Sequence, residues 1–289
     1  MTQIFTGLAP LAPRYDAFIL DLWGVLHDGV RPYPGVADCL RALKQAGKRI
    51  CLLSNAPRRL PSTLEKLTGM GLSPDLWDGL VTSGEATHLA LKHPPDAWHA
   101  ALGPRLYHLG PPRDNDVYEG LRFTIVERPD QADWVLNTGI DDFDETLDDY
   151  EPRLAACAAA KLPMVCANPD LIVVVGGKLA ICAGLLAKRY AELGGDVRHH
   201  GKPYLDVYQR CFALLGQPDP ARVLAIGDSL KTDIAGAERA GIAGALITGG
   251  IHREELGAAW GAAPDPALLR QVLAQSGPQP AAVLPRLVW

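Results

Sequence analysis

The strongest constraint on the fold is an apolar run at residues 17–20 that stops at a carboxylate, Asp21, before Gly24 and Gly29. An apolar run between polar ends fits a strand that is buried on both faces. Asp21 would then lie at the carboxyl end of a central parallel strand, at the sheet edge where ligands bind. A single Asp after an apolar run is more often a turn residue, so the interpretation depends on how the other strands end.

Two later apolar runs stop at polar residues in the same way: residues 49–53 at Ser54, and residues 222–226 at Gly227 and Asp228. Between the first two runs, apolar residues recur at helical spacing over residues 36–46. A strand, a helix and a parallel strand form a right-handed crossover, which places Asp21 and Ser54 on the same edge. The sequence therefore predicts an α/β fold with a central parallel sheet.

Residues 85–196 differ in composition from the segments on either side. Tryptophan, proline and acidic residues are frequent there, between short candidate strands. Near the end of this segment the pattern predicts a strand over 171–175 and a helix over 179–193. We therefore expect a core of residues 1–84 and 197–289 and an inserted α/β domain of residues 85–196. The proline-rich segment 276–289 is expected to pack on the core.

Composition excludes several classes of function. The 289 residues are 48% hydrophobic and 21% charged, as in soluble globular proteins. A net charge of -5 without a Lys/Arg cluster argues against nucleic-acid binding. The six cysteines are scattered, which fits reduced thiols in the cytoplasm. We find neither a signal-peptide pattern nor an apolar stretch long enough for a membrane span, so we expect a cytoplasmic protein with no membrane partner.

Five residues together supply what phosphoryl transfer to a carboxylate requires: Asp21, Ser54, Lys202, Asp228 and Asp233. A phosphomonoester carries nearly two negative charges at neutral pH. At about 4 Å and an effective dielectric constant near 20, each like-charged pair contributes about 4 kcal/mol of repulsion. Asp21 and Asp228 offer hard oxygen ligands for Mg²⁺, and Asp233 can orient a metal-bound water. Lys202 supplies positive charge, and the Ser54 hydroxyl can hold a phosphoryl oxygen.

Four motifs resemble those of the haloacid dehalogenase superfamily. They are Asp-Leu-Trp-Gly-Val-Leu at 21–26, Leu-Ser-Asn at 53–55, Gly-Lys-Pro at 201–203 and Gly-Asp-Ser-Leu-Lys-Thr-Asp at 227–233. The large insert, with Asn168-Pro169-Asp170 inside it, resembles that of the class IIA branch of sugar-phosphate, nitrophenyl-phosphate and pyridoxal-phosphate phosphatases. The resemblance covers residues 16–250. It implies a Rossmann-like three-layer core, a mobile cap domain and an aspartyl-phosphate intermediate.

The resemblance also implies a role for each matching residue. Asp21 is the nucleophile, Ser54 is the hydroxyl that contacts phosphate, and Lys202 is the charge stabiliser. The Mg²⁺ ligands would be Asp21, Asp228 and the backbone carbonyl of Trp23, with Asp233 in support. Asn55, Asn168 and Asp170 are expected to contact the substrate, the last two from a cap loop that faces the active site in relatives.

Trp23 departs from the phosphatase pattern, which has a second Asp here as general acid and then base. Acid–base catalysis typically contributes about 10² to 10⁴ in rate. Trp23 either packs against the cap or is compensated by another acid, for which His27 and Asp28 are the nearest candidates. A third possibility is a leaving group that hardly needs a proton, as in phenolic or acyl phosphates. The true dehalogenases also have aromatic residues here, but the retained Asp228 and Asp233 argue against their metal-free chemistry.

The sequence thus predicts a Mg²⁺-dependent phosphohydrolase acting on a small phosphorylated metabolite. Arg58 and Arg59, just after Asn55, either reach an anionic substrate or lie at the surface. One rival is a catalytically impaired protein that binds a phosphorylated ligand or a protein partner, which Trp23 supports. Another is a phospho-accepting switch of the receiver type, which the large insert disfavours. The sequence does not decide whether the protein forms a homodimer, for which the cap offers a surface.

Overall fold

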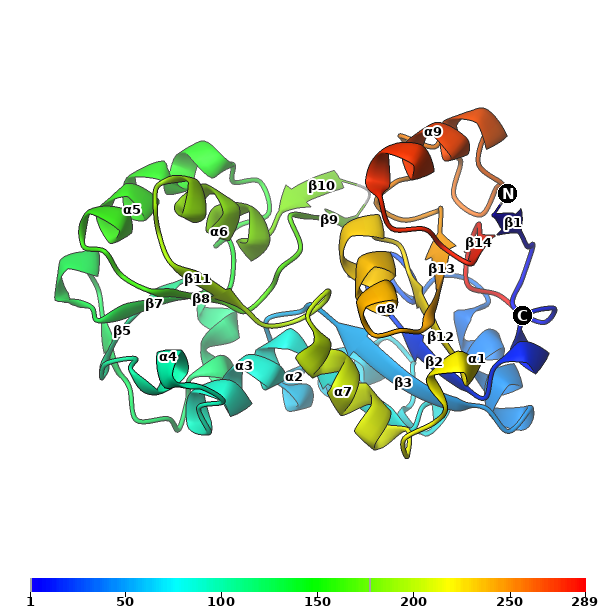
Figure 1. Ribbon diagram of the computed structural model, residues 1–289, viewed down its shortest axis with the longest axis horizontal. Coiled ribbons are helices and arrows are strands. Elements are labelled where there is room, and N and C mark those ends of the chain that lie inside the picture. The colour runs from blue at the N-terminus through cyan, green and yellow to red at the C-terminus, as the bar shows by residue number, and fades with distance from the viewer. Residues whose placement is uncertain (1, 177) are drawn as a thin grey trace.

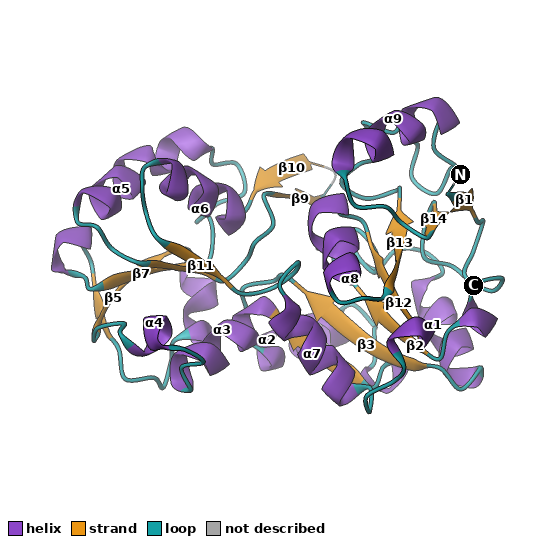
Figure 2. Ribbon diagram, viewed as in Figure 1, coloured by secondary structure: helices purple, strands orange, loops and turns teal. Residues whose placement is uncertain are grey.

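Two parallel sheets organise the molecule, as the computed structural model shows for residues 2–176 and 178–289 (Figures 1 and 2). The larger sheet has the strand order β1-β14-β13-β12-β2-β3-β4. Its strands are β1 Gln3–Ile4, β2 Ala17–Leu20, β3 Arg49–Ser54, β4 Gly79–Thr82, β12 Val223–Gly227, β13 Ala243–Ile247 and β14 Ala282–Leu284. The predicted α/β class with a parallel sheet is confirmed.

Strand β2 lies in the interior of the larger sheet, between β12 and β3. Phe18 is in register with Leu224 on one side and with Ile50 on the other. Successive side chains of a strand point to opposite faces. Phe18 accordingly packs in one apolar cluster, and Ile19 packs in a second cluster on the opposite face. Burial on both faces explains why the sequence of β2 is uninterrupted by polar residues.

Helices cover both faces of the larger sheet. The cluster that contains Phe18 also contains residues of α1, Val36–Gln45, and α2, Leu60–Gly69. The cluster that contains Ile19 includes residues of α7, Leu205–Leu214, and α8, Ala235–Arg239. This arrangement gives the three layers that the sequence predicted. It also leaves the carboxyl ends of the parallel strands at one shared edge.

The second sheet has the order β11-β8-β7-β5-β6 and lies beside the first (Figure 1). Its strands are β5 Arg105–Leu109, β6 Thr124–Val126, β7 Trp134–Asn137, β8 Met164–Cys166 and β11 Val197–His199. The neighbouring helices are α3 Ser83–Lys92, α4 Ala97–Ala100, α5 Leu147–Ala159 and α6 Ala183–Glu192. Strand β11 pairs with β8, so this sheet extends three residues beyond the predicted end of the insert at 196. "The insert" below means residues 85–199.

A β-hairpin lies between the two sheets (Figure 1). It consists of β9, Ile172–Val175, and β10, Lys178–Ile181, which pair antiparallel. The helix predicted over 179–193 is wrong at its start, because residues 178–181 form β10 and α6 begins at Ala183. A short apolar run reads equally well as strand or helix, and pairing with β9 decides its conformation.

The ends of the chain complete one side of the larger sheet. Strand β14 pairs with β13, and β1 pairs with β14 at the edge. The tail therefore packs on the core, and helix α9, Pro266–Ser276, precedes it. The remaining helical segments are short: Ala12–Arg14, Pro74–Leu76, Pro112–Val117, Pro129–Gln131, Pro220–Arg222 and Leu230–Ile234. Within the described residues, no helix has the length and apolar character of a membrane span.

Candidate active site

Three of the predicted site residues lie at the carboxyl ends of neighbouring strands. Asp21 follows β2, Ser54 ends β3, and Asp228 follows β12. Because these strands are adjacent and parallel, their ends meet at one edge of the sheet. All three side chains are buried. The crossover argument from the sequence therefore placed these residues correctly.

Lys202 enters this edge from a loop between the insert and α7. Its Nζ lies 2.6 Å from Asp21 Oδ1 and 2.7 Å from Asp233 Oδ1, and its side chain is only 2% exposed. A buried ammonium group requires such partners, because desolvation of an unpaired charge is very unfavourable. Lys202 thus joins the nucleophile candidate to the last residue of the fourth motif.

Asn55 positions the backbone of Lys202. The Lys202 N–H donates to Asn55 Oδ1 at 2.7 Å, and Asn55 Nδ2 donates to the Lys202 carbonyl at 3.1 Å. Gly201 permits this approach, since a Cβ there would clash with Asn55 Oδ1 and its φ is +124°. Asn55 is predicted to contact the substrate, but in the structure its amide oxygen and its amide nitrogen both form hydrogen bonds with the Lys202 backbone. Its substrate contact stays a prediction.

The carboxylates of Asp21, Asp228 and Asp233 form a buried cluster. Each offers an oxygen, and these oxygens lie within 4.8 Å of one another. Burial, together with the charges of Asp21 and Asp233, raises the pKa of Asp228 well above its usual value. Burial also raises the pKa of Asp21, although Lys202 opposes the shift. Clustered, buried carboxylates of this kind suit a hard divalent cation, which would relieve their repulsion.

Two glycines make room for the Asp228 carboxylate. A Cβ at Gly24 or at Gly250 would overlap Asp228 Oδ2, and Gly24 also has a φ of +75°. The Ile251 N–H donates to the same oxygen at 2.9 Å. Trp23 and Gly24 border the small pocket that contains the three carboxylates. These donors fit a Mg²⁺ site, and the assignment of the Trp23 carbonyl as a ligand stays a prediction.

Asp233 has protein partners for both carboxylate oxygens. Oδ1 accepts from Lys202, and Oδ2 accepts from the Ser229 N–H at 3.0 Å. Gly227 is required nearby, because a Cβ there would overlap the Asp233 carboxylate. Asp233 therefore holds Lys202 in place, a contact that the sequence did not predict. Its support of a metal-bound water stays a prediction.

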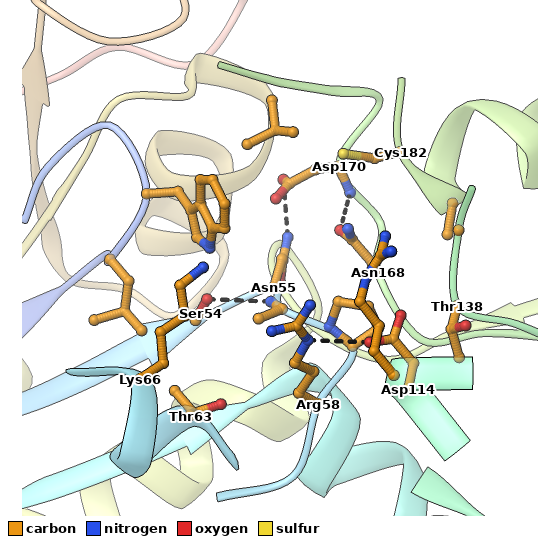
Figure 3. Close-up of a pocket in the computed structure, with 18 of the residues that line it drawn as sticks. Ser54, Asn55, Arg58, Thr63, Lys66, Asp114, Thr138, Asn168, Asp170 and Cys182 are labelled. Atoms are coloured by element: carbon orange, nitrogen blue, oxygen red, sulfur yellow. Dashed lines mark hydrogen bonds and ion pairs between the residues drawn. The ribbon is translucent and has the colours of Figure 1, made fainter. Parts of the chain in front are cut away.

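Ser54 and the insert residues Asn168 and Asp170 border a second cavity, which Asp21 also borders (Figure 3). Ser54 Oγ accepts from the Ala56 N–H at 3.1 Å, which leaves its hydroxyl hydrogen available to a ligand. Asn168 Oδ1 accepts from the Asp170 N–H at 2.9 Å, and Asp170 Oδ1 accepts from Asn55 Nδ2 at 2.9 Å. Asp170 thus ties the insert to the core, and its contact with substrate stays a prediction.

The ring of Trp23 lies between two other side chains at the cavity. Its edge-to-face partner is His27, at a centroid distance of 5.1 Å, and Lys66 Nζ lies 4.4 Å from its ring centroid. Gly29 accommodates the indole, because a Cβ there would overlap the ring. Trp23 therefore packs within the core side of the site, and its replacement of a general acid stays a prediction.

His27 and Asp28 have the properties of turn residues. His27 Nδ1 accepts from the Gly29 N–H at 3.0 Å, and burial lowers the pKa of His27 to about 4. Burial alone would raise the pKa of Asp28, but hydrogen bonds from the Arg31 and Val30 N–H groups outweigh it and lower that pKa. At neutral pH His27 is therefore neutral and Asp28 ionised. Asp28 can supply no proton.

A cavity of about 100 Å³ lies between the core and the insert. Arg58 borders it and pairs with Asp114 of the insert, with Nε 3.0 Å from Oδ1, whereas Arg59 pairs with Glu85. Arg58 therefore reaches the site and Arg59 does not border it. Burial raises the pKa of Asp114 to about 6, although Arg58 opposes the shift.

Sequence reasoning missed several cavity residues. Lys66 comes from α2, and Arg113, Thr138, Ile140 and Phe143 come from the insert. Burial and the nearby charges of Arg58 and Arg113 lower the pKa of Lys66 to about 8. No local pattern distinguishes Lys66 from an ordinary surface residue of a helix. Only the packing of α2 against the loop after β2 brings it to the site.

Comparisons with known proteins identify the class that this fold and site define. Residues 18–124 match a model for haloacid dehalogenase-like hydrolases, and residues 199–283 match a second model for HAD-hydrolase-like proteins. A solved hydrolase of the haloacid dehalogenase-like family from Brucella suis 1330 is 33% identical, with a TM-score of 0.82. The alignment covers 98% of this chain and 99% of that one. The chain belongs to the haloacid dehalogenase-like hydrolase family.

Two curated relatives are similar over most of their length. A 4-nitrophenylphosphatase from Schizosaccharomyces pombe is 25% identical over 260 residues, which cover 84% of this chain and 86% of the relative. A glycerol-3-phosphate phosphatase from Gallus gallus is 27% identical over 277 residues, covering 86% of this chain and 84% of the relative. The resemblance to class IIA phosphatases that the motifs suggested is confirmed.

Proposed function

We propose that this protein is a cytoplasmic, Mg²⁺-dependent phosphohydrolase that acts on a small phosphomonoester through an aspartyl-phosphate on Asp21. The observation that carries the proposal is the position of Lys202 between Asp21 and Asp233, with Asp228 in the same carboxylate cluster. The names of the two curated relatives, an aryl and an alkyl phosphate phosphatase, support a phosphomonoester as the substrate.

In the first half-reaction an Asp21 oxygen forms a bond to phosphorus while the bond to the leaving oxygen breaks. Lys202 holds the Asp21 carboxylate through one oxygen, which leaves the other to attack. The Ser54 hydroxyl donates to a phosphoryl oxygen as charge on the phosphoryl group redistributes. Mg²⁺ held by Asp21 and Asp228 would supply positive charge opposite the phosphoryl oxygens.

In the second half-reaction water attacks phosphorus and its proton passes to solvent, the bond to Asp21 breaks, and inorganic phosphate leaves. The family's second Asp would first protonate the leaving oxygen and then deprotonate this water, but Trp23 replaces it. The leaving group must then depart with little help, so aryl phosphates should react faster than alkyl phosphates. A phosphate-release panel of both classes, with and without Mg²⁺, tests the proposal; no release from any member would contradict it.

Trp23 also supports a second candidate, a family member that binds a phosphorylated ligand without turning it over. In that case Asp21, Ser54 and Lys202 would form a phosphate-binding site only. Thermal-shift measurements with the same panel separate the two functions. Stabilisation by a phosphomonoester that is never hydrolysed would favour the binding protein, whereas release of phosphate would favour the enzyme.

A further inference from the structure

Three cationic side chains border the cavity. Arg58 and Lys66 reach it from the core, and Arg113 reaches it from the insert. Figure 3 shows Lys66 rising from α2 and Arg58 extending toward Asp114 across the cavity. Within the described residues that border the cavity, Asp114 is the acidic group paired with this set.

The three cations differ in how their charge is balanced. Arg58 is paired with Asp114. Arg113 donates to the carbonyl oxygens of Asp141 and Ile140, which use two of its five N–H groups and provide no negative charge. Among the described residues, no carboxylate oxygen lies within 4.0 Å of Lys66 Nζ, which instead lies over the Trp23 ring. Among the described residues, Lys66 and Arg113 therefore border the cavity without an ion-pair partner within 4.0 Å, although Asp28 acts on Lys66 and Asp114 on Arg113 from farther away.

We propose that Lys66 and Arg113 bind a second anionic group, a carboxylate or a second phosphoryl group, of the phosphomonoester whose reacting phosphoryl lies at Asp21. This inference rests on the proposed function, because it assigns the reacting phosphoryl to Asp21. Lys202 is already committed to Asp21 and Asp233, so it does not serve this group. Substrate with a neutral tail would leave both cations unpaired.

Asp21 and the two cations border the same cavity, but the cation that contacts Asp21 is Lys202. Lys66 Nζ lies over the Trp23 ring instead, 4.4 Å from its centroid. Phe143, Ile140 and Val173 contribute apolar surface to the cavity. The Arg113 guanidinium lies over the Phe143 ring, with Cζ 5.2 Å from the centroid, which holds it toward the cavity. A short apolar linker between two anionic ends matches this arrangement.

Binding of non-hydrolysable phosphonates tests the proposal without turnover. Isothermal titration calorimetry in Mg²⁺ would compare 3-phosphonopropionate and propane-1,3-bisphosphonate with propylphosphonate, which lacks the second anion. A hydrogen-bonded ion pair contributes enough that the wild-type protein should bind at least one of the first two about tenfold more tightly. The tighter of the two shows whether the second group is a carboxylate or a phosphoryl group.

Variants show which residues cause the tighter binding of the probes with a second anionic group. Lys66→Met should reduce it to about twofold or less, and Arg113→Gln should reduce it as a second, independent variant. Lys188→Met, at an exposed position of α6, is the matched control and should keep the full preference. Equal affinities for all three probes in the wild-type protein, or a preference that survives both variants, would overturn the inference.

A phosphate-release assay on the same preparations distinguishes this failure from failure of the proposed function. A preference that depends on Lys66 in a protein that hydrolyses no phosphomonoester would support the anion site and refute the hydrolase. Hydrolysis of aryl phosphates by a protein that binds the three probes equally would do the reverse.

Discussion

Lys202 Nζ and Asp21 Oδ1 lie 2.6 Å apart, although the two residues are 181 positions apart in sequence. Both side chains are buried, so water screens their interaction little. The pair fixes one oxygen of Asp21 and places a positive charge where an incoming dianion would otherwise meet a carboxylate alone. The chemistry proposed for the site depends on this pair.

Replacement of the nucleophile should end turnover. Asp21→Asn keeps the size of the side chain but removes the charge that attacks phosphorus. We expect no phosphate release above background in a colorimetric assay. The thermal unfolding midpoint should stay close to that of the wild-type protein, because Lys202 keeps its ion pair with Asp233 and the repulsion between Asp21 and Asp228 is removed. Undiminished release by this variant would refute the assignment of Asp21.

Loss of Lys202 should affect both turnover and stability. Lys202→Met leaves Asp21 and Asp233 buried without their cation, and breaking a buried ion pair from one side destabilises a protein by about 3 to 5 kcal/mol. We expect a loss of that order in the free energy of unfolding measured with urea, together with loss of phosphate release. Lys188→Met, exposed on α6, should change neither quantity. Full stability of the Lys202 variant would show that the ion pair is not formed in solution.

The missing acid can be restored. Trp23→Asp places a carboxyl group two residues after Asp21, and its proton helps most when the leaving alkoxide is a poor leaving group. We expect kcat/KM to rise more for alkyl than for aryl phosphates, within the roughly 10² to 10⁴ range of acid–base catalysis. Trp23→Asn opens the same space without a proton donor and serves as the control. Equal changes in the two variants would mean that space, and not the proton, limits the reaction.

The space around Asp228 should control metal dependence. A Cβ at Gly250 would overlap Asp228 Oδ2, so Gly250→Ala must displace that carboxylate. We expect the Mg²⁺ concentration for half-maximal phosphate release to rise about tenfold or more, in line with other changes beside metal ligands. Gly69→Ala, where a Cβ meets nothing within 4 Å, is the matched control. An unchanged Mg²⁺ requirement in Gly250→Ala would argue against Asp228 as a ligand.

The central strands and the reacting residues could be predicted from sequence because their signals are local. A strand buried on both faces is an apolar run, and β2 and β12 are such runs. The polar residues that end them, Asp21 and Asp228, are then placed by the rules of parallel sheets. The order of four motifs adds Lys202, which no strand end would have located.

The rest of the site depends on contacts that no short pattern encodes. Lys66 lies in α2, and its local sequence resembles that of any helical lysine. Its contact with the Trp23 ring, which the sequence does not encode locally, is what marks it. Residues 179–181 of strand β10 fall within the predicted helix because so short an apolar run fits both the helical and the strand period, and pairing with β9 decides its conformation. Strands β1 and β14 have two and three residues, too few for any periodicity.

His27 should make stability depend on pH. Its pKa falls from the usual value near 6.5 to about 4, first because of burial and then because of Lys66. Between those two pH values the unfolded chain binds a proton at His27 that the folded protein does not bind. Stability is therefore lost as the pH falls through this range, by up to about 1.4 kcal/mol for each pH unit, and the loss levels off below about pH 4.

The variant His27→Asn isolates this contribution, because an Asn side chain can still accept from the Gly29 N–H but does not titrate. The free energy of unfolding, measured in urea from pH 4 to pH 7, should fall more steeply toward acid in the wild-type protein than in the variant. Phosphate release near pH 7 should change by much less than the roughly 10² expected for loss of a general acid, since a neutral, hydrogen-bonded His27 is a turn residue. If the free energy of unfolding varied with pH in the same way in both proteins, His27 would not be buried and neutral. A hundredfold loss of phosphate release in the variant would instead indicate that His27 is the general acid.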